Sequence, residues 1–258
     1  MIVLFTDFGL AGPYVGQMKT VLAREAPGVP VIDLFADAPA FDPMLSAYLL
    51  AGYAPWFPAG TVFIAVVDPG VGTPRPPVVV EAGGALFVGP GNGLFEPLHR
   101  RMQTRAWKIA WSPPTLSASF HGRDLFAPIA ARLAVEGVAP LEKAGGVTPL
   151  ELTEARRPDW PDELDRIVYV DHYGNAMTGH RGSTLSTELC VVLPDGTRVH
   201  HASTFGEVPV GAALWYVNSN GLAEIAVNQG RASECLGLAP GTAIQFIHET
   251  FSGSEPKK

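Results

Sequence analysis

The chain has 258 residues, of which 47% are hydrophobic, and this is enough for one large domain or for two modest domains with separate cores. Its 18 basic and 25 acidic residues give a formal net charge of -7, which argues against nucleic acid or an anionic membrane as the main partner. No apolar run approaches the roughly 20 residues that span a bilayer. Met1 leads directly into a strand-like segment without a charged leader. We therefore expect a cytoplasmic protein without a membrane partner.

Neither metal binding nor a disulfide is indicated by the composition. Cys190 and Cys235 lie far apart in apolar surroundings without CxxC spacing, so we expect two reduced, buried thiols and no metal site. The basic cluster HRRMQTR, residues 99–105, is more typical of a solvated face than of a binding patch.

Strand and helix patterns alternate in the first half of the chain. Strands are predicted at residues 2–5, 30–35 and 61–67, helices at about 14–25, 43–57 and 123–137, a short helix after 90–93, and a hairpin at 77–89 with its turn at Gly83 and Gly84. The last long helix has one apolar face, formed by Leu125, Ile129, Ala130 and Leu133. This order predicts an α/β domain with a largely parallel sheet, which we assign to residues 1–160.

The pattern changes at RPDWPDELD, residues 157–165, which has the prolines and charges of a linker or domain edge. Helical periodicity then disappears, and short β-rich segments follow at 166–171, 188–193, 198–203, 212–218, 223–227 and 243–249. We expect a smaller antiparallel β domain, a barrel or a sandwich, over residues 161–252. A disordered tail is expected at 253–258.

Polar residues follow several predicted strands of the first half. Asp7 follows the first strand, Asp68 the third, and a glycine-rich loop at 88–93 another, and ligands of open α/β sheets bind at the carboxyl ends of the strands. The chain has neither GxxxxGK[ST] nor GxGxxG, so a phosphate loop is not supported. A strand-end carboxylate without such a loop indicates a ligand with hydroxyl groups or a cation. Asp7 as a simple turn or helix cap is the alternative.

Three separate loops present groups that can carry chemistry: Asp68, Arg75 and His121. His121 precedes a predicted helix start, where the positive helix end lowers the pKa of a histidine. A single histidine is more often structural, but the three residues together favour a functional site. Later, DHYGNAMTG at 171–179 can hold an amine, stack on a flat ring and bind its edge, or it can be a plain β-turn.

Six ordered motifs between Thr6 and Ala232 carry a resemblance to one family. They are TDFG (6–9), VDPGVGT (67–73), GPGNGLF (89–95), FHGRDLFAP (120–128), DHYGNAMT (171–178) and NSNGLAEIAVNQGRA (218–232). They resemble the S-adenosyl-L-methionine (SAM) hydroxide adenosyltransferases, or SAM hydrolases, which are related to the fluorinases and chlorinases. The resemblance implies an N-terminal α/β domain, a C-terminal β-barrel and a homotrimer. It places the active sites between the N-terminal domain of one subunit and the C-terminal domain of the next.

The resemblance also implies roles for individual residues. The catalytic residues that handle water are Asp68, Arg75 and His121. The substrate-binding residues are Asp7 at the ribose hydroxyls, Asp171 at the methionine amine, Tyr173 beside adenine, Asn175 at adenosine, and Ser219 and Glu224 toward the methionine end. The chain departs from the family pattern at Gly91, which replaces the acid of GPDNG, at Tyr173, where Phe is common, and at Gly179, where Asn often follows Thr178.

The implied reaction is attack of water or hydroxide on the ribose 5′ carbon of SAM, giving adenosine and L-methionine, with SAM as substrate and no cofactor. Two alternatives are halide transfer to the same carbon and non-catalytic binding of adenosine or SAM. Asp68 stands where the halogenating relatives have a tyrosine, and Gly122 where they need a halide-binding hydroxyl. These differences favour hydrolysis, and the presence of all three catalytic residues disfavours a binder.

Overall fold

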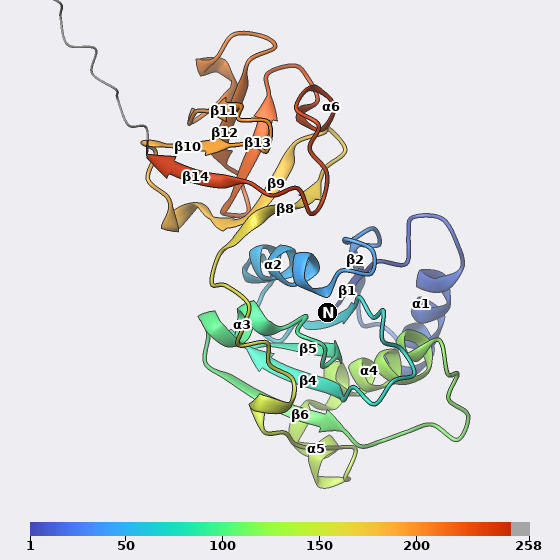
Figure 1. Cartoon of the computed structure of the whole chain (residues 1–258). Coiled ribbons are helices and arrows are strands. Elements are labelled where there is room, and N and C mark those ends of the chain that lie inside the picture. Colours follow the sequence, from blue (N-terminus) through green and yellow to red (C-terminus); the bar gives the residue numbers. More distant parts are fainter. Residues whose placement is uncertain (249–258) are drawn as a thin grey trace, which may run out of the picture. The chain divides into compact units, whose positions relative to one another are not determined.

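The structure of the protein, a computed structural model, describes residues 1–248 (Figure 1). The chain folds into two compact units, Met1–Asp162 and the residues from Glu163 onward. Each unit has a hydrophobic core of its own. None of the described helices combines the length and the apolar character that a membrane span requires. The predicted tail at 253–258 lies outside the described residues.

A seven-stranded mixed sheet forms the centre of the first unit, with the strand order β2-β1-β3-β5-β4-β6-β7. The strands are β1 (Ile2–Thr6), β2 (Val31–Phe35), β3 (Val62–Val66), β4 (Pro77–Ala82), β5 (Ala85–Pro90), β6 (Thr104–Ile109) and β7 (Val147–Pro149). As predicted, β2, β1, β3 and β5 are parallel, whereas the hairpin of β4 and β5 and the unpredicted strands β6 and β7 add antiparallel neighbours. The parallel ladders bring the carboxyl ends of β1, β3 and β5 to one edge.

Helices lie on both faces of this sheet (Figure 1). They are α1 (Tyr14–Glu25), α2 (Pro43–Tyr53), α3 (Glu96–Arg101), α4 (Ala127–Glu136) and α5 (Val138–Lys143). Helix α2 begins as its sequence predicts, because the Asp42 side chain accepts the Leu45 N–H at 3.0 Å and Pro43 occupies the first turn. A one-turn π-helix, Gly122–Phe126, leads into α4.

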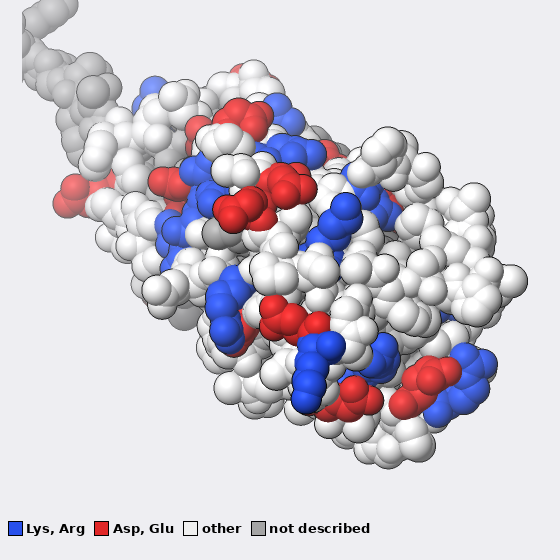
Figure 2. All heavy atoms as spheres, turned by 90° about the horizontal axis from the view of Figure 1, so that it is seen from below, with Lys and Arg blue, Asp and Glu red and all other residues white. Residues whose placement is uncertain are grey.

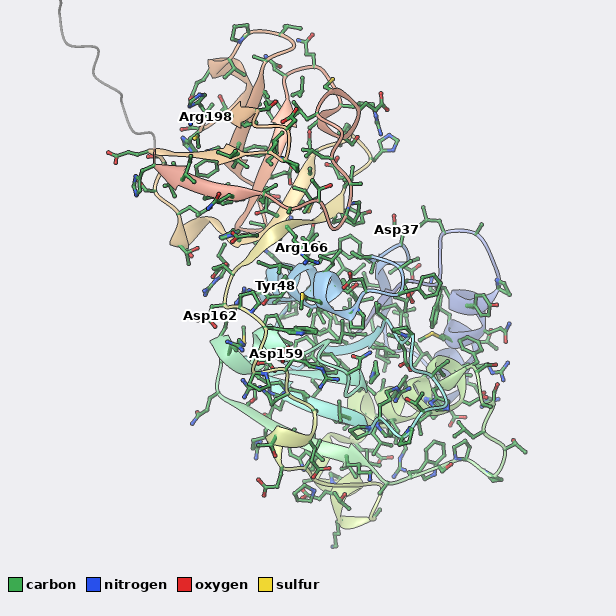
Figure 3. The ribbon with its side chains drawn as sticks, viewed as in Figure 1. Asp37, Tyr48, Asp159, Asp162, Arg166 and Arg198 are labelled. Carbon is green, nitrogen blue, oxygen red and sulfur yellow. The ribbon has the colours of Figure 1, made fainter. Side chains whose placement is uncertain are left out.

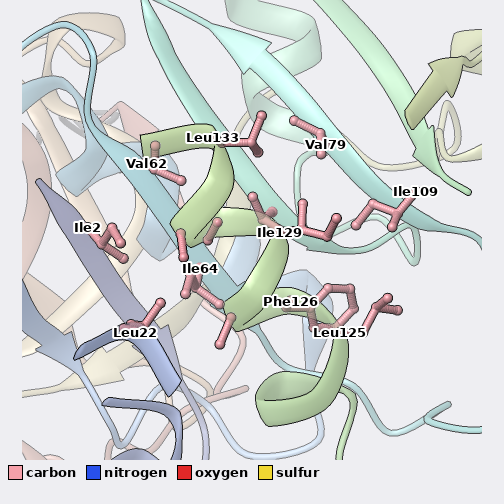
Figure 4. Close-up of a cluster of buried hydrophobic side chains, with 14 of the residues drawn as sticks. Ile2, Leu22, Val62, Ile64, Val79, Ile109, Leu125, Phe126, Ile129 and Leu133 are labelled. Atoms are coloured by element: carbon pink, nitrogen blue, oxygen red, sulfur yellow. The ribbon is translucent and has the colours of Figure 1, made fainter. Parts of the chain in front are cut away.

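The main core of the first unit lies between α1, α4 and the sheet. The predicted face of Leu125, Ile129, Ala130 and Leu133 is buried there, with exposures of 0–4%. Figure 4 shows this face against the strands that carry Val62, Ile64 and Val79. Full burial of one such aliphatic side chain contributes roughly 1.5–3 kcal/mol, so this packing fixes the segment that follows His121.

The second unit contains two antiparallel sheets, in the orders β12-β13-β9-β8 and β11-β10-β14. Its elements are β8 (Leu164–Val170), β9 (Ala176–Arg181), β10 (Leu189–Val192), β11 (Arg198–Val199), β12 (Ala213–Val217), β13 (Leu222–Val227), α6 (Ala232–Cys235) and β14 (Gln245–His248). The sheets share one core, in which Trp215 is fully buried and donates to the Leu189 carbonyl at 2.9 Å.

The second unit is not the closed barrel that we predicted. Among the described residues, the two sheets are joined by isolated bridges, Arg166 with Ala243 and His201 with Trp215, rather than by a continuous ladder. Strand β11 is only two residues long, which leaves little backbone for closing the ladder. Strand β9 was missed because its motif, rich in Gly and Asn at the start, has the composition of a turn.

The basic cluster at 99–105 is only in part the solvated face that we predicted, because Arg105 is exposed whereas the cluster's residues on helix α3 are buried or half-buried. Its histidine, His99, is buried, and burial lowers the pKa of His99 to about 4. Arg100 donates to Glu96 and to Asp162, each at 2.8 Å. The cluster therefore ties helix α3 to the segment that ends the first unit.

Glu96 anchors the same segment from the buried side. It is 0% exposed and accepts hydrogen bonds from Arg156 at 2.7 Å and from the Arg157 N–H at 2.8 Å. Burial alone would raise the pKa of Glu96, but these hydrogen bonds bring it below its usual value. Tyr48 of α2 donates to the Pro161 carbonyl, and Figure 3 labels Tyr48 together with Asp159 and Asp162 of this segment. The predicted linker is thus held against the first unit up to Asp162.

Positive and negative side chains are mixed on the face drawn in Figure 2, and the described part of that face has no broad region of one sign. Exposed ion pairs of the first unit include Lys19 with Asp33 at 2.5 Å and Arg105 with Glu81 at 2.6 Å. Both cysteines are free, but only Cys190 is buried; Cys235 is exposed, which corrects the expectation that both are buried.

Candidate active site

A pocket of about 740 Å³ lies in the first unit where β1 and β3 end. Its lining includes the charged or titratable residues Asp7, Asp68, His121 and Arg123. Aromatic rings from Phe8, Tyr14, Phe41 and Phe120 form much of the remaining wall. The volume and the mixture of apolar walls with a few polar groups are typical of a small-molecule site, and the position is the one that an open α/β sheet predicts.

The two carboxylates of the pocket come from neighbouring parallel strands. Strands β1 and β3 pair in register from Ile2 with Val62 to Thr6 with Val66. Asp7 directly follows β1, and its N–H donates to the Val66 carbonyl at 3.4 Å. Asp68 follows β3 by one intervening residue, so both acids emerge at the same edge.

Asp68, Arg75 and His121 meet in one cluster, as their separate loops suggested. Arg75 Nε donates to Asp68 Oδ1 at 2.8 Å, and Arg75 Nη2 donates to the other carboxylate oxygen, which makes the pair bidentate. Arg75 Nη2 also lies 3.2 Å from His121 Nδ1. The Arg75 and Asp68 side chains are 10% and 5% exposed. The Arg75 guanidinium packs over the Phe126 ring, 5.6 Å from its centre.

These contacts determine the state of the His121 ring. A guanidinium can only donate, so His121 Nδ1 must accept, and the proton of the neutral ring resides on Nε2. Burial and then the positive charge of Arg75 lower the pKa of His121, against the smaller opposing effects of Asp68 and Asp124. His121 is therefore a neutral ring near pH 7 that presents an Nε2–H.

His121 lies at the start of the π-helical turn rather than at a regular helix start. The Ala127 N–H donates to the Gly122 carbonyl five residues back, and Pro128 has no N–H with which to continue the α pattern from residue 124. Such turns occur often at functional sites. Asp124 accepts the Ser117 N–H at 3.0 Å and pairs with Arg123, which fixes the loop before His121.

Phe41 is a site residue that the sequence analysis missed. Its φ of 60° is rare for a non-glycine residue, and its N–H donates to Asp7 Oδ2 at 3.0 Å. Burial, the largest effect, raises the pKa of Asp7, and this N–H partly offsets it. The Phe41 ring is 78% exposed and lines the pocket. A left-handed phenylalanine has no sequence signature, so only the structure identifies this contact.

Two glycines of the motifs are explained by close packing. A Cβ at Gly122 would lie 3.2 Å from both Phe8 Cζ and Phe120 Cε2 and 3.3 Å from Met18 Sδ. A Cβ at Gly91 would lie 2.9 Å from the Pro76 carbonyl oxygen. A side chain at either position therefore requires its neighbours to move, and Gly91 cannot be replaced by the family's usual acid without displacing Pro76 or residue 91 itself.

The remaining predicted site residues lie in the second unit. Asp171 and Asn175 bracket the turn between β8 and β9, and Asp171 Oδ1 accepts the Asn175 N–H at 2.8 Å. Tyr173 projects from this turn and is 72% exposed. The turn is thus a regular hydrogen-bonded one, as the plain β-turn alternative predicted, but it carries an exposed aromatic ring beside a carboxylate.

Glu224 is the most deeply buried of the predicted acids, with 3% exposure. It accepts a hydrogen bond from Asn218 Nδ2 at 2.7 Å and one from the Tyr216 hydroxyl, which lies opposite it in the β12–β13 ladder. Burial, together with the nearby charge of Asp171, raises the pKa of Glu224. Ser219 is exposed in the turn between β12 and β13. Tyr216 was missed because a strand tyrosine is usually a packing residue.

Within residues 1–248, no group of three or more His, Cys, Asp or Glu side chains has an arrangement that could hold a metal ion.

Comparison with known proteins identifies the family of the chain. Residues 2–145 match the family SAM hydroxide adenosyltransferase N-terminal domain, and residues 165–245 match SAM hydroxide adenosyltransferase C-terminal domain. An (R)-S-adenosyl-L-methionine hydrolase of Thermus thermophilus is 41% identical, with 95% of this chain and 99% of the relative covered. A fluorinase of Nocardia brasiliensis is 25% identical, with 95% and 96% covered.

A solved structure supports the fold over the same length. The crystal structure of an uncharacterized conserved protein from Thermotoga maritima matches with a TM-score of 0.82 and 29% identity, covering 96% of this chain and 100% of that one. The chain belongs to the SAM hydroxide adenosyltransferase family.

Proposed function

We propose that this protein is an enzyme that hydrolyses SAM to adenosine and L-methionine by attack of water on the ribose 5′ carbon. The observation that carries this proposal is the half-buried Asp68–Arg75–His121 cluster, in which Asp68 and His121 line the pocket that also contains Asp7. A protein that only bound a nucleoside would gain little from assembling this cluster. The name of the 41% identical relative specifies the (R) form of SAM, and we propose the same sulfonium epimer as the substrate here.

The proposed reaction is a single displacement. The water oxygen forms a bond to C5′ while the C5′–S bond breaks, and the bonding pair moves to sulfur, which changes from a sulfonium to the neutral thioether of methionine. The water proton leaves the new 5′ hydroxyl, so SAM and water give adenosine, methionine and one proton. Because the neutral thioether of methionine is a good leaving group, the reaction requires no cofactor.

The tautomer of His121 assigns the proton transfer. His121 Nδ1 is occupied by Arg75 and Nε2 carries the ring proton, so the neutral ring can orient a water molecule by donation but cannot accept a proton. Asp68 retains free lone pairs on both oxygens after binding Arg75, and we propose it as the proton acceptor. A carboxylate is sufficient, because the water becomes strongly acidic only as its bond to C5′ forms.

Arg75 fixes the other two groups in this scheme. Its two bonds to Asp68 define the plane of the carboxylate, and its third contact defines the His121 ring. Arg75 therefore acts through its two partners, because the attacking water oxygen gains positive charge until its proton passes to Asp68.

We further propose that substrate binding is divided between the two units. Asp7 accepts hydrogen bonds from the ribose hydroxyls in the first unit, while the second unit binds adenine and the methionine end. Its binding residues are Asp171, Tyr173, Asn175, Ser219 and Glu224. In this proposal the chain is a homotrimer, and each active site takes its first unit from one subunit and its second unit from the next.

Halide transfer is the alternative reaction, since a fluorinase is among the relatives. A halide about 4 Å from the Asp68 carboxylate is repelled by roughly 4 kcal/mol at an effective dielectric of about 20, and Arg75 offsets part of this. The position that would need a donor hydroxyl is Gly122, which is closely packed by Phe8 and Phe120. The pocket therefore favours water over a halide.

Incubation of the purified protein with (R)- and (S)-SAM, followed by chromatography, tests the proposal. We expect adenosine and methionine in equimolar amounts, formed faster from the (R) epimer, and formed about 10²–10⁴-fold more slowly by Asp68→Asn. Recovery of unchanged SAM bound to the wild-type protein would instead identify a binding protein.

A further inference from the structure

The loop after β5 holds the strand that carries Asp68. Asn92 Nδ2 donates to the Val67 carbonyl at 2.9 Å, and that carbonyl belongs to the peptide bond that links Val67 to Asp68. We propose that Asn92 is a positioning residue for hydrolysis, which sets the direction of the Asp68 carboxylate without contacting the substrate. This inference rests on the proposed function of Asp68.

The carboxyl end of β3 requires such a partner. The β3–β5 ladder ends at the pair Ile64 and Val88, three residues before Val67. The Val66 carbonyl accepts from the Asp7 N–H on the β1 side, and the Val67 carbonyl accepts from Asn92 on the β5 side. Beyond the end of the β3–β5 ladder, the Asn92 amide thus supplies a hydrogen bond to β3 in place of the backbone of β5.

Asn92 is itself held from two directions. Its Oδ1 accepts the Leu94 N–H at 3.3 Å, so one side-chain amide uses both its donor and its acceptor. A Cβ at the next residue, Gly93, would lie 2.7 Å from both Arg157 Cγ and Trp160 Cη2, so these two side chains pack closely against the loop. The segment anchored by Glu96 therefore restrains Asn92, and a bond from a restrained loop can fix the direction of its partner.

The consequence concerns turnover more than substrate affinity. Asp68 is proposed to face the attacking water, not the nucleoside. A tilt of its carboxylate therefore reduces the stabilisation of the transition state and leaves the ground-state affinity for the substrate almost unchanged. Misplacement of a catalytic group by about 1 Å can cost about 100-fold in rate.

The test compares Asn92→Ala and Asn92→Asp with a matched control, Thr61→Val. The Asp variant keeps the acceptor for Leu94 but, when ionised, loses the donor to Val67. Thr61 lies at the opposite end of the same strand, is 1% exposed, and donates from Oγ1 to the Pro58 carbonyl at 2.7 Å. The control therefore removes one buried side-chain bond to a backbone carbonyl without touching the Asp68 end.

We expect both Asn92 variants to lower kcat by about 10- to 100-fold, with KM within about threefold of wild type, at temperatures below every melting transition. Thr61→Val should lose thermal stability to a similar extent and keep the wild-type kcat. If Asn92→Ala does not fold, Asn92→Asp carries the same comparison.

Three results would overturn the inference: wild-type kcat in the folded Asn92 variants, a rise in KM without a fall in kcat, or an equal fall in kcat for Thr61→Val. The same assay separates this outcome from failure of the proposed function. A wild-type protein that forms no adenosine removes the proposed function, and with it the basis of this inference, whereas an active wild type with fully active Asn92 variants overturns the inference alone.

Discussion

Arg75 Nη2 lies 3.2 Å from His121 Nδ1, so a group that can only donate faces a ring nitrogen that must accept. This contact links the protonation state of His121 to the geometry of the whole cluster, because Arg75 also carries both hydrogen bonds to Asp68. Protonation of Nδ1 would remove the acceptor and place two positive groups side by side.

The first prediction is therefore an acid limb in kcat that belongs to His121. Burial and Arg75 lower its pKa from the ordinary value of 6.5, so the active neutral ring persists below pH 6.5 and turnover falls as the pH drops through the lowered pKa. The free energy of unfolding also falls as the pH drops, because between the folded and unfolded pKa values of His121 the unfolded state binds more protons. A kcat–pH profile measures this; an acid limb with its midpoint above 6.5 would contradict the assignment.

His121→Asn is the matched variant for that profile. The asparagine carbonyl can still accept from Arg75, but it does not titrate, and the Nε2–H is lost. We expect lower turnover and a residual profile without the His121 limb. An unchanged limb in this variant would show that another group titrates.

The second prediction concerns Asp68 and Arg75. Asp68→Asn keeps the shape of the side chain and one acceptor for Arg75 but removes the proposed proton acceptor, and Arg75→Ala removes the group that fixes both partners. Each should lower kcat by about 10²–10⁴-fold, the usual contribution of a positioned acid–base group. Equilibrium titration with adenosine should show nearly unchanged affinity. Wild-type turnover in either variant would refute its role.

The third prediction separates binding from chemistry at Asp7. Asp7→Ala removes the proposed ribose acceptor and the partner of the strained Phe41 N–H. Because ribose contacts exist in the ground and transition states alike, we expect a higher KM and a weaker adenosine affinity with a smaller effect on kcat. Calorimetry with adenosine measures the first effect. A fall in kcat at unchanged affinity would instead place Asp7 in the chemical step.

The strand ends were predictable from the sequence because apolar runs of β-branched residues stop at Asp7 and Asp68. The convergence of Asp68, Arg75 and His121 was expected from their three separate loops and from the order of motifs, but no local pattern encodes the contact between Arg75 and His121, which are 46 positions apart. The tautomer of His121 follows from its contact with Arg75, which only the structure shows.

Other features depend on long-range packing that a local pattern does not contain. The π-helical turn at 122–126 looked like an ordinary helix start. The charged cluster at 99–105 looked solvated because the sequence does not show that Arg100 pairs with the buried Glu96 and with the distant Asp162. The closed barrel was not found in the described part of the chain because some predicted strands are too short to complete it. In the predicted strand 198–203, for example, only two residues form a ladder with a neighbouring strand.

The fourth prediction addresses the proposed trimer. Asp68→Asn disables the first unit and Asp171→Ala the second, so each variant alone should be inactive or weak. If a site combines units from different subunits, a one-to-one mixture reassembled from both variants should regain about one quarter of the wild-type activity, because each site draws its two halves at random. Light scattering should give the mass of three chains. A fully active monomer, or no recovery on mixing, would contradict shared sites.

The nucleophile is the central claim, and isotope labelling tests it most directly. SAM is incubated with the enzyme in ¹⁸O-water containing excess chloride or fluoride, and the nucleoside products are analysed by mass spectrometry. Attack of water at C5′ predicts adenosine with one ¹⁸O at the 5′ oxygen and no 5′-halo-5′-deoxyadenosine. Unlabelled adenosine, or a halogenated nucleoside as the main product, would contradict the account.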